Sequence, residues 1–321
     1  MITLEEIQAA RDRIADSALR TPLLRLPLDD AGREIYLKLE NLQPIGSFKL
    51  RGAGNAMARA GREALAEGVF TASAGNMAQG VAWNARRLSL PCSVVVPDHA
   101  PATKLAAIER LGGRVIKLPF ERWWDVIVTG EFEGLDGFFV HPVTDPDVMA
   151  GNGTIGLEIL EDLPDVDAVL IPYGGGGLSC GIASALRALK PAARLYAVEV
   201  ETAAPLAASL RAGAPVEVAY RPSFVDGIGG KSVLPAMWTL ARELLDGSLV
   251  VSLDEARAAI RLLAERGRVI AEGAGAVPVA AALAGRAGGG KVVCVVSGGN
   301  IDRDVLAGIL AAPPSPGPFP H

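Results

Sequence analysis

Histidine, cysteine and aromatic residues are scarce in this chain of 321 residues, which has three histidines, three cysteines and 5% aromatic residues. Cys92, Cys180 and Cys294 lie far apart among apolar or small residues, so we interpret them as buried hydrophobic side chains rather than as a disulfide or a metal site. A histidine-based zinc site or a Ser-His-Asp triad is poorly supplied, and only His141 stays open as a candidate. We therefore expect no metal, and chemistry that depends on residues other than histidine.

A strong charge of one sign and a long apolar run are also lacking. The net charge is −5 and lysine and arginine form no cluster, which argues against a nucleic-acid partner. No apolar run is long enough to span a bilayer, and residues 1–13 are charged and amphipathic, unlike a signal peptide. We therefore expect a cytoplasmic protein with neither a membrane nor a nucleic acid as its partner.

Alanine and glycine are abundant, which suits helices packed tightly on a parallel sheet. Capping-box patterns at Thr3 and Ser252 predict helices that run to about Leu19 and Arg266. Between them, helical segments alternate with expected strands at residues 35–40, 93–97, 114–118, 137–140, 168–172, 194–200 and 291–297.

This alternation predicts an α/β fold made of two open, twisted αβα domains with mainly parallel sheets. Residues 1–69 and 146–312 would form the larger domain, and residues 70–145 a smaller domain inserted into it. Residues 313–321 would form a Pro-rich tail.

Gly174, Gly175, Gly176 and Gly177 lie between an expected buried strand and a helix. Their backbone N–H groups and the helix N-terminus favour an anion, and four consecutive glycines exceed what a tight turn needs, so we predict a phosphate site. A dinucleotide pattern fails because Ser179 or Cys180 stands at its third glycine. Glu199, however, ends the next strand where a ribose-binding acid would lie, so a nicotinamide-dependent oxidoreductase stays an alternative from this segment alone.

Lys49 lies between Phe48 and Leu50 in the first turn of a predicted helix. The helix dipole and the apolar neighbours favour its neutral amine, which is the form that attacks an aldehyde. The other interpretation is an exposed lysine whose stem packs on the surface. Position alone does not decide between the two.

Two further segments follow expected strands. Ser73 and Asn76 precede a helix that begins near Met77, where backbone N–H groups could hold a substrate carboxylate or where the side chains could simply cap the helix. Ser297 closes the last apolar strand, at the end where open parallel sheets bind ligands, although a simple turn would also fit.

Taken together, these segments resemble the threonine dehydratase and serine racemase family of enzymes that use pyridoxal 5'-phosphate (PLP), of fold type II, the tryptophan synthase beta-like group. Residues 47–53, SFKLRGA, resemble the motif that binds the cofactor as a Schiff base, and residues 73–76 resemble the substrate-carboxylate loop. The four glycines resemble the phosphate cup, and Ser297 matches the residue that bonds the pyridine nitrogen. Residues 141–147, 151–154 and 272–275 match the family's framework, so the resemblance runs in order along nearly the whole chain.

The resemblance implies a set of site residues. Lys49 would be the catalytic residue, and Asn76 would touch both the substrate and the phenolic oxygen of the cofactor. The implied cofactor contacts are Phe48, Lys49, Asn76, Gly174, Gly175, Gly176, Gly177, Leu178 and Ser297. The implied substrate contacts are Ser73, Ala74, Gly75, Asn76 and Met77.

The resemblance also implies the reaction: β-elimination of water from L-threonine or L-serine, giving a 2-oxo acid and ammonia, in a homodimer. Within the family, the alternatives are a dehydratase of 3-hydroxyaspartate or another hydroxy amino acid, and an amino-acid racemase. Outside it, they are the nicotinamide-dependent oxidoreductase and a PLP-binding protein without catalytic activity.

The sequence departs from the family at several positions. Ala74 stands where serine racemases carry a second serine, which favours a dehydratase. Met77 and Asn152 stand where relatives usually have histidine and glutamine, so the substrate is less well defined than the reaction. Glu199 matches one carboxylate of a cation site found in some relatives, but Pro205 replaces the second, and a hard cation needs several oxygen ligands.

Overall fold

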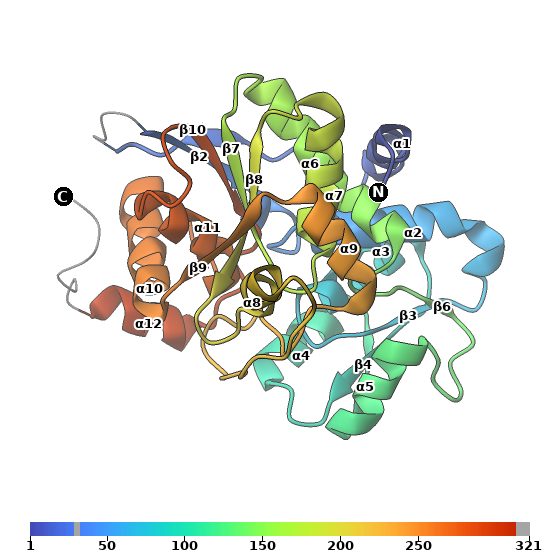
Figure 1. The fold of residues 1–321 in the computed structure, drawn as a ribbon. Helices are drawn as coiled ribbons and strands as arrows, with labels where there is room; N and C mark the ends of the chain where they lie inside the picture. The colour runs from blue at the N-terminus through green and yellow to red at the C-terminus, as the bar shows by residue number, and fades with distance from the viewer. Residues whose placement is uncertain (29–32, 313–321) are drawn as a thin grey trace.

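The computed structural model describes residues 1–28 and 33–312, and its strands form two sheets surrounded by helices (Figure 1). The larger sheet contains β1 (Leu23–Arg25), β2 (Arg33–Leu39), β7 (Ala168–Pro172), β8 (Arg194–Val200), β9 (Gly247–Val251) and β10 (Gly290–Val296). The smaller sheet contains β3 (Val69–Ala72), β4 (Cys92–Pro97), β5 (Arg114–Leu118) and β6 (Phe138–Phe139).

The helices follow the same order along the chain. They are α1 (Leu4–Ile14), α2 (Lys49–Ala64), α3 (Asn76–Leu88), α4 (Ala102–Arg110), α5 (Phe120–Thr129), α6 (Pro146–Asp162), α7 (Gly177–Leu189), α8 (Pro205–Ala212), α9 (Pro235–Leu244), α10 (Leu253–Leu262), α11 (Gly273–Leu283) and α12 (Arg303–Ala311). A 3-10 turn, η1 (Glu40–Leu42), follows β2, and a π-helical turn, η2 (Leu263–Gly267), extends α10.

Strand order confirms the predicted fold class. In the described residues the larger sheet has the order β1-β2-β10-β7-β8-β9 and the smaller has β5-β4-β3-β6. Every pairing is parallel except that of β1 with β2. The smaller sheet comes from within residues 69–139, close to the segment predicted as an inserted domain. The domain boundaries themselves stay predictions, because α2 packs on α3 as well as on α6, and the predicted tail 313–321 lies outside the described residues.

Both predicted capping boxes are present. Thr3 Oγ1 accepts from the backbone N of Glu6 at 3.2 Å while the Glu6 carboxylate accepts from Thr3 N at 2.9 Å, and Ser252 forms the same pair with Glu255. The predicted end of the first helix at Leu19 is wrong. Helix α1 ends at Ile14, because the i→i+4 hydrogen bonds give way to tighter i→i+3 bonds, from Ala15 N to Asp12 O and from Ser17 N to Ile14 O. Leu19 lies beyond this turn and is 53% exposed. The second helix ends as predicted, with η2 reaching Gly267.

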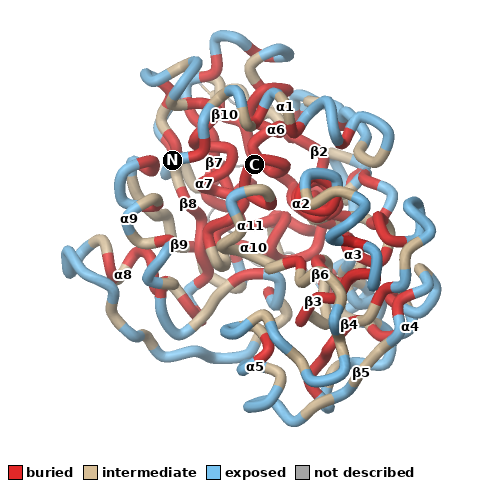
Figure 2. Tube along the Cα trace, turned by 90° about the vertical axis from the view of Figure 1, so that its right-hand side faces the viewer, coloured by how far each residue is buried: buried red, intermediate tan, exposed pale blue. Residues whose placement is uncertain are grey.

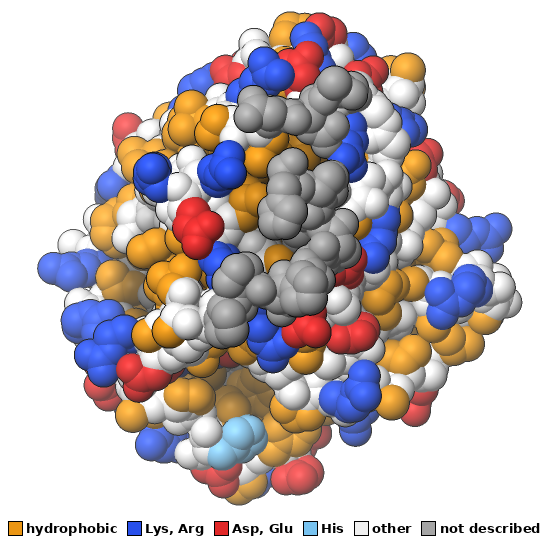
Figure 3. Space-filling view, turned by 90° about the vertical axis from the view of Figure 1, so that its left-hand side faces the viewer, with side chains coloured by type: hydrophobic (Ala, Val, Ile, Leu, Met, Phe, Trp, Pro, Cys, Tyr) orange, Lys and Arg blue, Asp and Glu red, His pale blue; other side chains and the backbone are white. Residues whose placement is uncertain are grey.

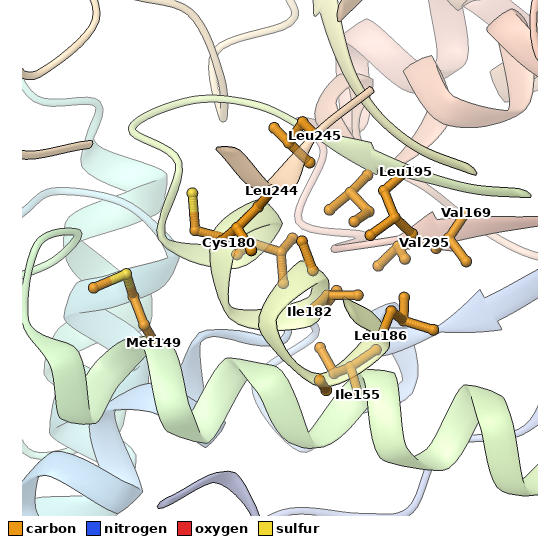
Figure 4. Packing of buried hydrophobic residues seen from close by; sticks show 14 of the residues in the cluster. Met149, Ile155, Val169, Cys180, Ile182, Leu186, Leu195, Leu244, Leu245 and Val295 are labelled. Carbon is orange, nitrogen blue, oxygen red and sulfur yellow. The ribbon is translucent and has the colours of Figure 1, made fainter. Parts of the chain in front are cut away.

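Alternate residues of the central strands point to opposite faces of the larger sheet. Val169 on β7 and Val295 on β10 pack with Leu186 of α7 on one face, as Figure 4 shows. Leu170 and Cys294, their sequence neighbours, pack against α10 and α11 on the other face. A parallel sheet covered on both sides is buried throughout, and Figure 2 shows buried positions concentrated along these strands, α7 and α11. All three cysteines are free and buried, as predicted.

This arrangement decides where a ligand can bind. Strands β7 and β10 are neighbours, so their carboxyl ends, which lead into Gly174 and Ser297, lie at the same edge of the larger sheet. Ligands of open parallel sheets bind outside that edge, at the point where the strand order changes direction. In the smaller sheet, β3 likewise ends just before Ser73.

On the face seen in Figure 3, lysine and arginine side chains are scattered among acidic and hydrophobic ones. Among the described helices, none combines the length and the apolar character needed to cross a membrane.

Candidate active site

One cleft of about 360 Å³ collects every site residue that the sequence predicts. It is lined by Phe48, Lys49, Ser73, Ala74, Gly75, Asn76, Met77, Gly174, Gly175, Gly176, Gly177, Leu178 and Ser297. These residues come from α2, the turn between β3 and α3, the turn between β7 and α7, and the end of β10. The structure therefore brings the predicted residues together, while the role of each stays a prediction.

Lys49 is the first residue of α2, and its position is fixed by the end of β10. Phe48 N donates to Ser297 O at 3.0 Å, which places the start of the helix beside Ser297. Lys49 Nζ donates to Pro142 O at 3.1 Å and lies 5.1 Å from the centre of the Phe48 ring. Burial lowers the pKa of Lys49 to about 8, although the carboxylate of Glu272 opposes this shift. The amine is thus neutral at a far lower pH than an ordinary lysine.

Two glycines of the loop, Gly175 and Gly177, lie so close to Val143 that neither position admits a side chain. A Cβ atom on Gly175 would lie 2.5 Å from Val143 Cγ1, and one on Gly177 would lie 2.7 Å from Val143 O. Gly176 has φ +101°, a left-handed conformation that favours glycine. The loop leads directly into α7, whose first N–H groups have no partner within the helix. Backbone donors without side chains form the kind of site that binds phosphate.

His141 holds the turn that lies against this loop. Its Nδ1 accepts from the backbone N of Val143 and of Thr144, each at 3.1 Å. Burial lowers the pKa of His141, which keeps the ring neutral and Nδ1 able to accept. These bonds hold the turn in which Pro142 O faces Lys49 and Val143 faces the glycines.

The turn between β3 and α3 has an open helix N-terminus. Ser73 Oγ accepts from Gly75 N at 3.2 Å, and in the described part of the chain no side chain caps α3. The alternative interpretation of Ser73 and Asn76 as ordinary helix caps is therefore wrong. Uncapped N–H groups at a helix start attract an anion such as a carboxylate.

Glu272 also lines the cleft, and its contact with Asn76 could not be predicted from the sequence motifs. It was recognised only as part of a matching framework segment, yet its Oε1 accepts from Asn76 Nδ2 at 2.9 Å inside the cleft. Burial raises the pKa of Glu272 to about 7. One feature of the sequence could have indicated this role: Glu272 is an acidic residue in an otherwise apolar, glycine-rich segment. A buried carboxyl group in such a segment needs a partner.

Three further lining residues of the cleft come from segments that no motif connected. Lys104 of α4 and Trp123 of α5 lie on the side of the smaller sheet, and Asp226 lies in the segment before α9. Their positions depend on tertiary packing alone.

Glu199 serves the fold and does not face the cleft. Its carboxylate accepts from Leu206 N at 2.9 Å, from Ala207 N at 2.7 Å and from Ser248 Oγ at 2.6 Å. Both oxygens are therefore committed to the start of α8 and to β9, which removes the acid that a dinucleotide ribose would need. In residues 1–28 and 33–312, no three His, Cys, Asp or Glu side chains are grouped so as to hold a metal ion.

The two residues that depart from the family pattern, Met77 and Asn152, lie at different distances from the cleft. Met77 lines the cleft but is only 2% exposed and packs into the core of the smaller sheet. Asn152 is buried behind the glycine loop, where its Nδ2 donates to Gly177 O at 3.4 Å. Met77 can therefore shape the cleft wall, whereas Asn152 acts on the loop from behind.

Comparisons with known proteins agree with this geometry. The family of pyridoxal-phosphate dependent enzymes matches residues 14–298. An L-threonine ammonia-lyase of Thermotoga maritima is 42% identical over 315 residues, covering 97% of this chain and 78% of that protein. The structure of maize serine racemase superposes with a TM-score of 0.89 at 32% identity, covering 95% of this chain and 96% of that one. The structure of the processed form of threonine deaminase isoform 2 from Solanum lycopersicum superposes with a TM-score of 0.86 at 35% identity, covering 97% of this chain and 92% of that one.

The chain therefore belongs to the family of pyridoxal-phosphate dependent enzymes, in the branch of threonine dehydratases and serine racemases. Its cleft fits that cofactor. A lysine amine with a lowered pKa is present for the aldehyde, and a glycine loop with no room for a side chain at Gly175 or Gly177 is present for the phosphate. The oxidoreductase alternative explained only the glycine loop and Glu199, and Glu199 is turned away from the cleft.

Proposed function

We propose that this enzyme deaminates L-threonine, L-serine or both: it eliminates the β-hydroxyl group as water, and hydrolysis of the enamine product consumes one water and releases ammonia and a 2-oxo acid. The observation that supports this most directly is the placement of the Lys49 amine in one cleft with the uncapped start of α3 and the glycine loop. The names of similar proteins point the same way, since one is an L-threonine ammonia-lyase and another a threonine deaminase.

Lys49 would act twice. Its neutral amine would hold the cofactor through the aldehyde, and once released it would take the proton from the substrate Cα. Burial suits it to both tasks, because a pKa of about 8 leaves a useful fraction of neutral amine near physiological pH. The cofactor, when bound, supplies the electron sink that makes this Cα proton acidic.

The remaining cleft residues would bind and orient. The N–H groups at the start of α3, around Gly75 and Asn76, would hold the substrate carboxylate. The glycine loop would hold the phosphate. Ser297, 3% exposed at the end of β10, would offer the pyridine nitrogen a hydroxyl group rather than an acid, which leaves that nitrogen largely unprotonated and favours elimination over transamination.

Racemisation is the second candidate, because the maize serine racemase structure is so similar. Racemisation needs a second proton donor on the face opposite the lysine. In this chain Ala74 lines the cleft at the position where serine racemases carry serine, and its methyl group cannot deliver a proton. This favours elimination.

A substrate panel tests the proposal. Purified protein with PLP would be given L-threonine, L-serine, 3-hydroxyaspartate and other hydroxy amino acids, and ammonia, 2-oxo acid and D-amino acid would be measured. We expect ammonia and 2-oxo acid in equal amounts from L-threonine or L-serine, and loss of both in Lys49→Ala. D-serine formed as fast as pyruvate would contradict the elimination assignment. Bound cofactor without turnover of any substrate would indicate a non-catalytic binding protein.

The expected homodimer rests on family resemblance, and the cytoplasmic location rests on composition. Both stay predictions. Sedimentation of the purified enzyme would measure the first, and fractionation of the source cells the second.

A further inference from the structure

The side-chain amide of Asn76 is held from two sides. Its Nδ2 donates to Glu272 Oε1 at 2.9 Å, and its Oδ1 accepts from Asn300 Nδ2 at 2.8 Å. Asn76 begins α3, Glu272 immediately precedes α11, and Asn300 follows β10. Three separate segments of the chain therefore meet at one amide.

The network fixes which way round this amide lies. Asn300 Nδ2 also donates to Ile45 O at 2.8 Å, and a backbone carbonyl can only accept. The nitrogen of Asn300 must therefore face Ile45, and the Asn76 atom beside that nitrogen must be the oxygen. The nitrogen of Asn76 is then turned to Glu272, whose carboxylate accepts. The Ile45 carbonyl thus determines the direction of every bond as far as Glu272, whose Oε1 accepts.

The surrounding backbone leaves room for this network only because two residues are glycine. A Cβ atom on Gly298 would lie 2.6 Å from Glu272 Oε1 and 3.3 Å from Asn76 Nδ2. A Cβ atom on Gly46 would lie 2.6 Å from Asn300 Oδ1. Gly298 directly follows Ser297, so the network touches the segment that is expected to contact the cofactor ring.

We propose that Glu272 and Asn300 are positioning residues, which orient the Asn76 amide so that its second N–H group is donated to the phenolic oxygen of PLP. Nδ2 has two hydrogens, one of which is used by Glu272, and Asn76 lines the cleft where the other is available. This inference rests on the proposed function, because it requires the cofactor to lie in that cleft.

The direction of the Asn76 amide matters because the phenolic oxygen of the cofactor can carry a negative charge. A donated N–H group stabilises a negative phenolic oxygen, whereas a reversed amide would place its own oxygen against that charge. Asn300→Asp replaces the donor by a carboxylate that can only accept, so it requires Asn76 to turn its nitrogen away from Glu272. Asn300→Ala removes the contact without demanding the reversal.

The test measures cofactor binding and its spectrum rather than turnover. Apo-protein of each variant is titrated with PLP to obtain Kd, and the two absorbance bands of the bound cofactor, from the charged and the neutral phenolic oxygen, are compared across pH. Thermal melts of the apo-proteins confirm that each variant folds. Asn41→Asp is the matched control: Asn41 also donates to a backbone carbonyl, Ile270 O at 3.1 Å, but it lies outside the Asn76 network.

We expect Asn300→Asp to raise Kd by about tenfold or more and to shift absorbance toward the neutral form, with Asn300→Ala affected less. Glu272→Gln keeps an oxygen acceptor and should stay within about threefold of the native Kd, whereas Glu272→Ala should not. A role in filling space alone would reverse the order of the two Asn300 variants, since aspartate has the shape of asparagine. That reversal, or an Asn300→Asp variant indistinguishable from Asn41→Asp, would overturn the inference. Failure of the native protein to take up PLP would instead refute the proposed function.

Discussion

Lys104 Nζ lies 2.6 Å from Asp226 Oδ2, and both residues line the cleft. Lys104 belongs to α4 beside the smaller sheet, and Asp226 belongs to the segment before α9 in the larger part of the fold. Their side chains are 34% and 53% exposed, so the pair is in contact with solvent. An exposed ion pair of this kind contributes little to stability, but it joins α4 to the segment before α9 where both line the cleft.

Breaking this pair should change substrate binding without unfolding the protein. We expect Lys104→Ala to raise KM by about two- to fivefold, because such pairs are worth up to about 1 kcal/mol. The native enzyme should show the same rise in KM at high salt, which screens exposed charges, while the variant should be insensitive to salt. The charge-swapped double variant, Lys104→Asp with Asp226→Lys, should recover most of the native KM. Equal salt dependence in the native enzyme and Lys104→Ala would rule out this role.

The pKa of Lys49 predicts how fast the apo-protein takes up its cofactor. A pKa of about 8 means that the reactive neutral amine grows with pH and is half formed near pH 8. We therefore expect the rate of covalent attachment, followed by absorbance, to rise with pH and to level off above about pH 9. The rate with Nα-acetyl-lysine, whose side-chain amine is free, is measured under the same conditions and corrects for the ionisation of PLP itself. A rate that still climbs toward pH 10.5, the usual value for lysine, would show that burial does not act as described.

Steric contact with Val143 predicts which glycine of the loop can be replaced. Gly175→Ala would place Cβ 2.5 Å from Val143 Cγ1, and we expect it to weaken PLP binding by about tenfold or more. Gly174→Ala is the matched control, because its Cβ would meet the nearest atom, Ile228 Cα, at an ordinary 3.4 Å. Adding Val143→Ala to Gly175→Ala should restore much of the affinity. Titration of the three apo-proteins measures this, and equal losses at Gly174 and Gly175 would contradict it.

Arg51, two residues after Lys49, is buried in an ion network and should control stability. It is 1% exposed and donates to the carboxylates of Glu40 and Glu158, each also buried. Removing one partner of such a network leaves buried charge uncompensated, so we expect Arg51→Leu to lower the free energy of unfolding by about 3–5 kcal/mol in urea. Arg59→Leu on the same helix breaks a partly exposed pair with Asp147 and should change it by about 0.5 kcal/mol or less. Similar losses in both variants would contradict this distinction.

The sequence could predict the parts of the fold and of the site whose determinants are local. Strand β7, the glycine loop and α7 follow from a buried apolar run and four glycines, and the capping boxes follow from Thr3 and Ser252. Helix α6 could not be predicted, because its interior contains Gly151, which disfavours a helix. A Cβ atom on Gly151 would lie 2.5 Å from Arg51 O, so the glycine is needed for close packing against α2. Tertiary contact, which no local pattern reports, overrides propensity there.

The same limit applies to the cleft. Lys49 and Ser297 stood out because each lies at the end of a recognisable element. Glu272, Lys104 and Asp226 reach the cleft from segments whose spacing in the sequence says nothing about their distance in space.

The central claim is that Lys49, and no other lysine, carries the cofactor, and reduction with borohydride tests it most directly. Lys104 lines the same cleft and provides an internal comparison. The purified protein would be loaded with PLP, reduced and digested, and the modified peptide identified by mass spectrometry. The account predicts a pyridoxyl group on Lys49 and loss of the visible absorbance band in Lys49→Ala. A label on Lys104, or no label on a protein that still releases ammonia, would contradict it.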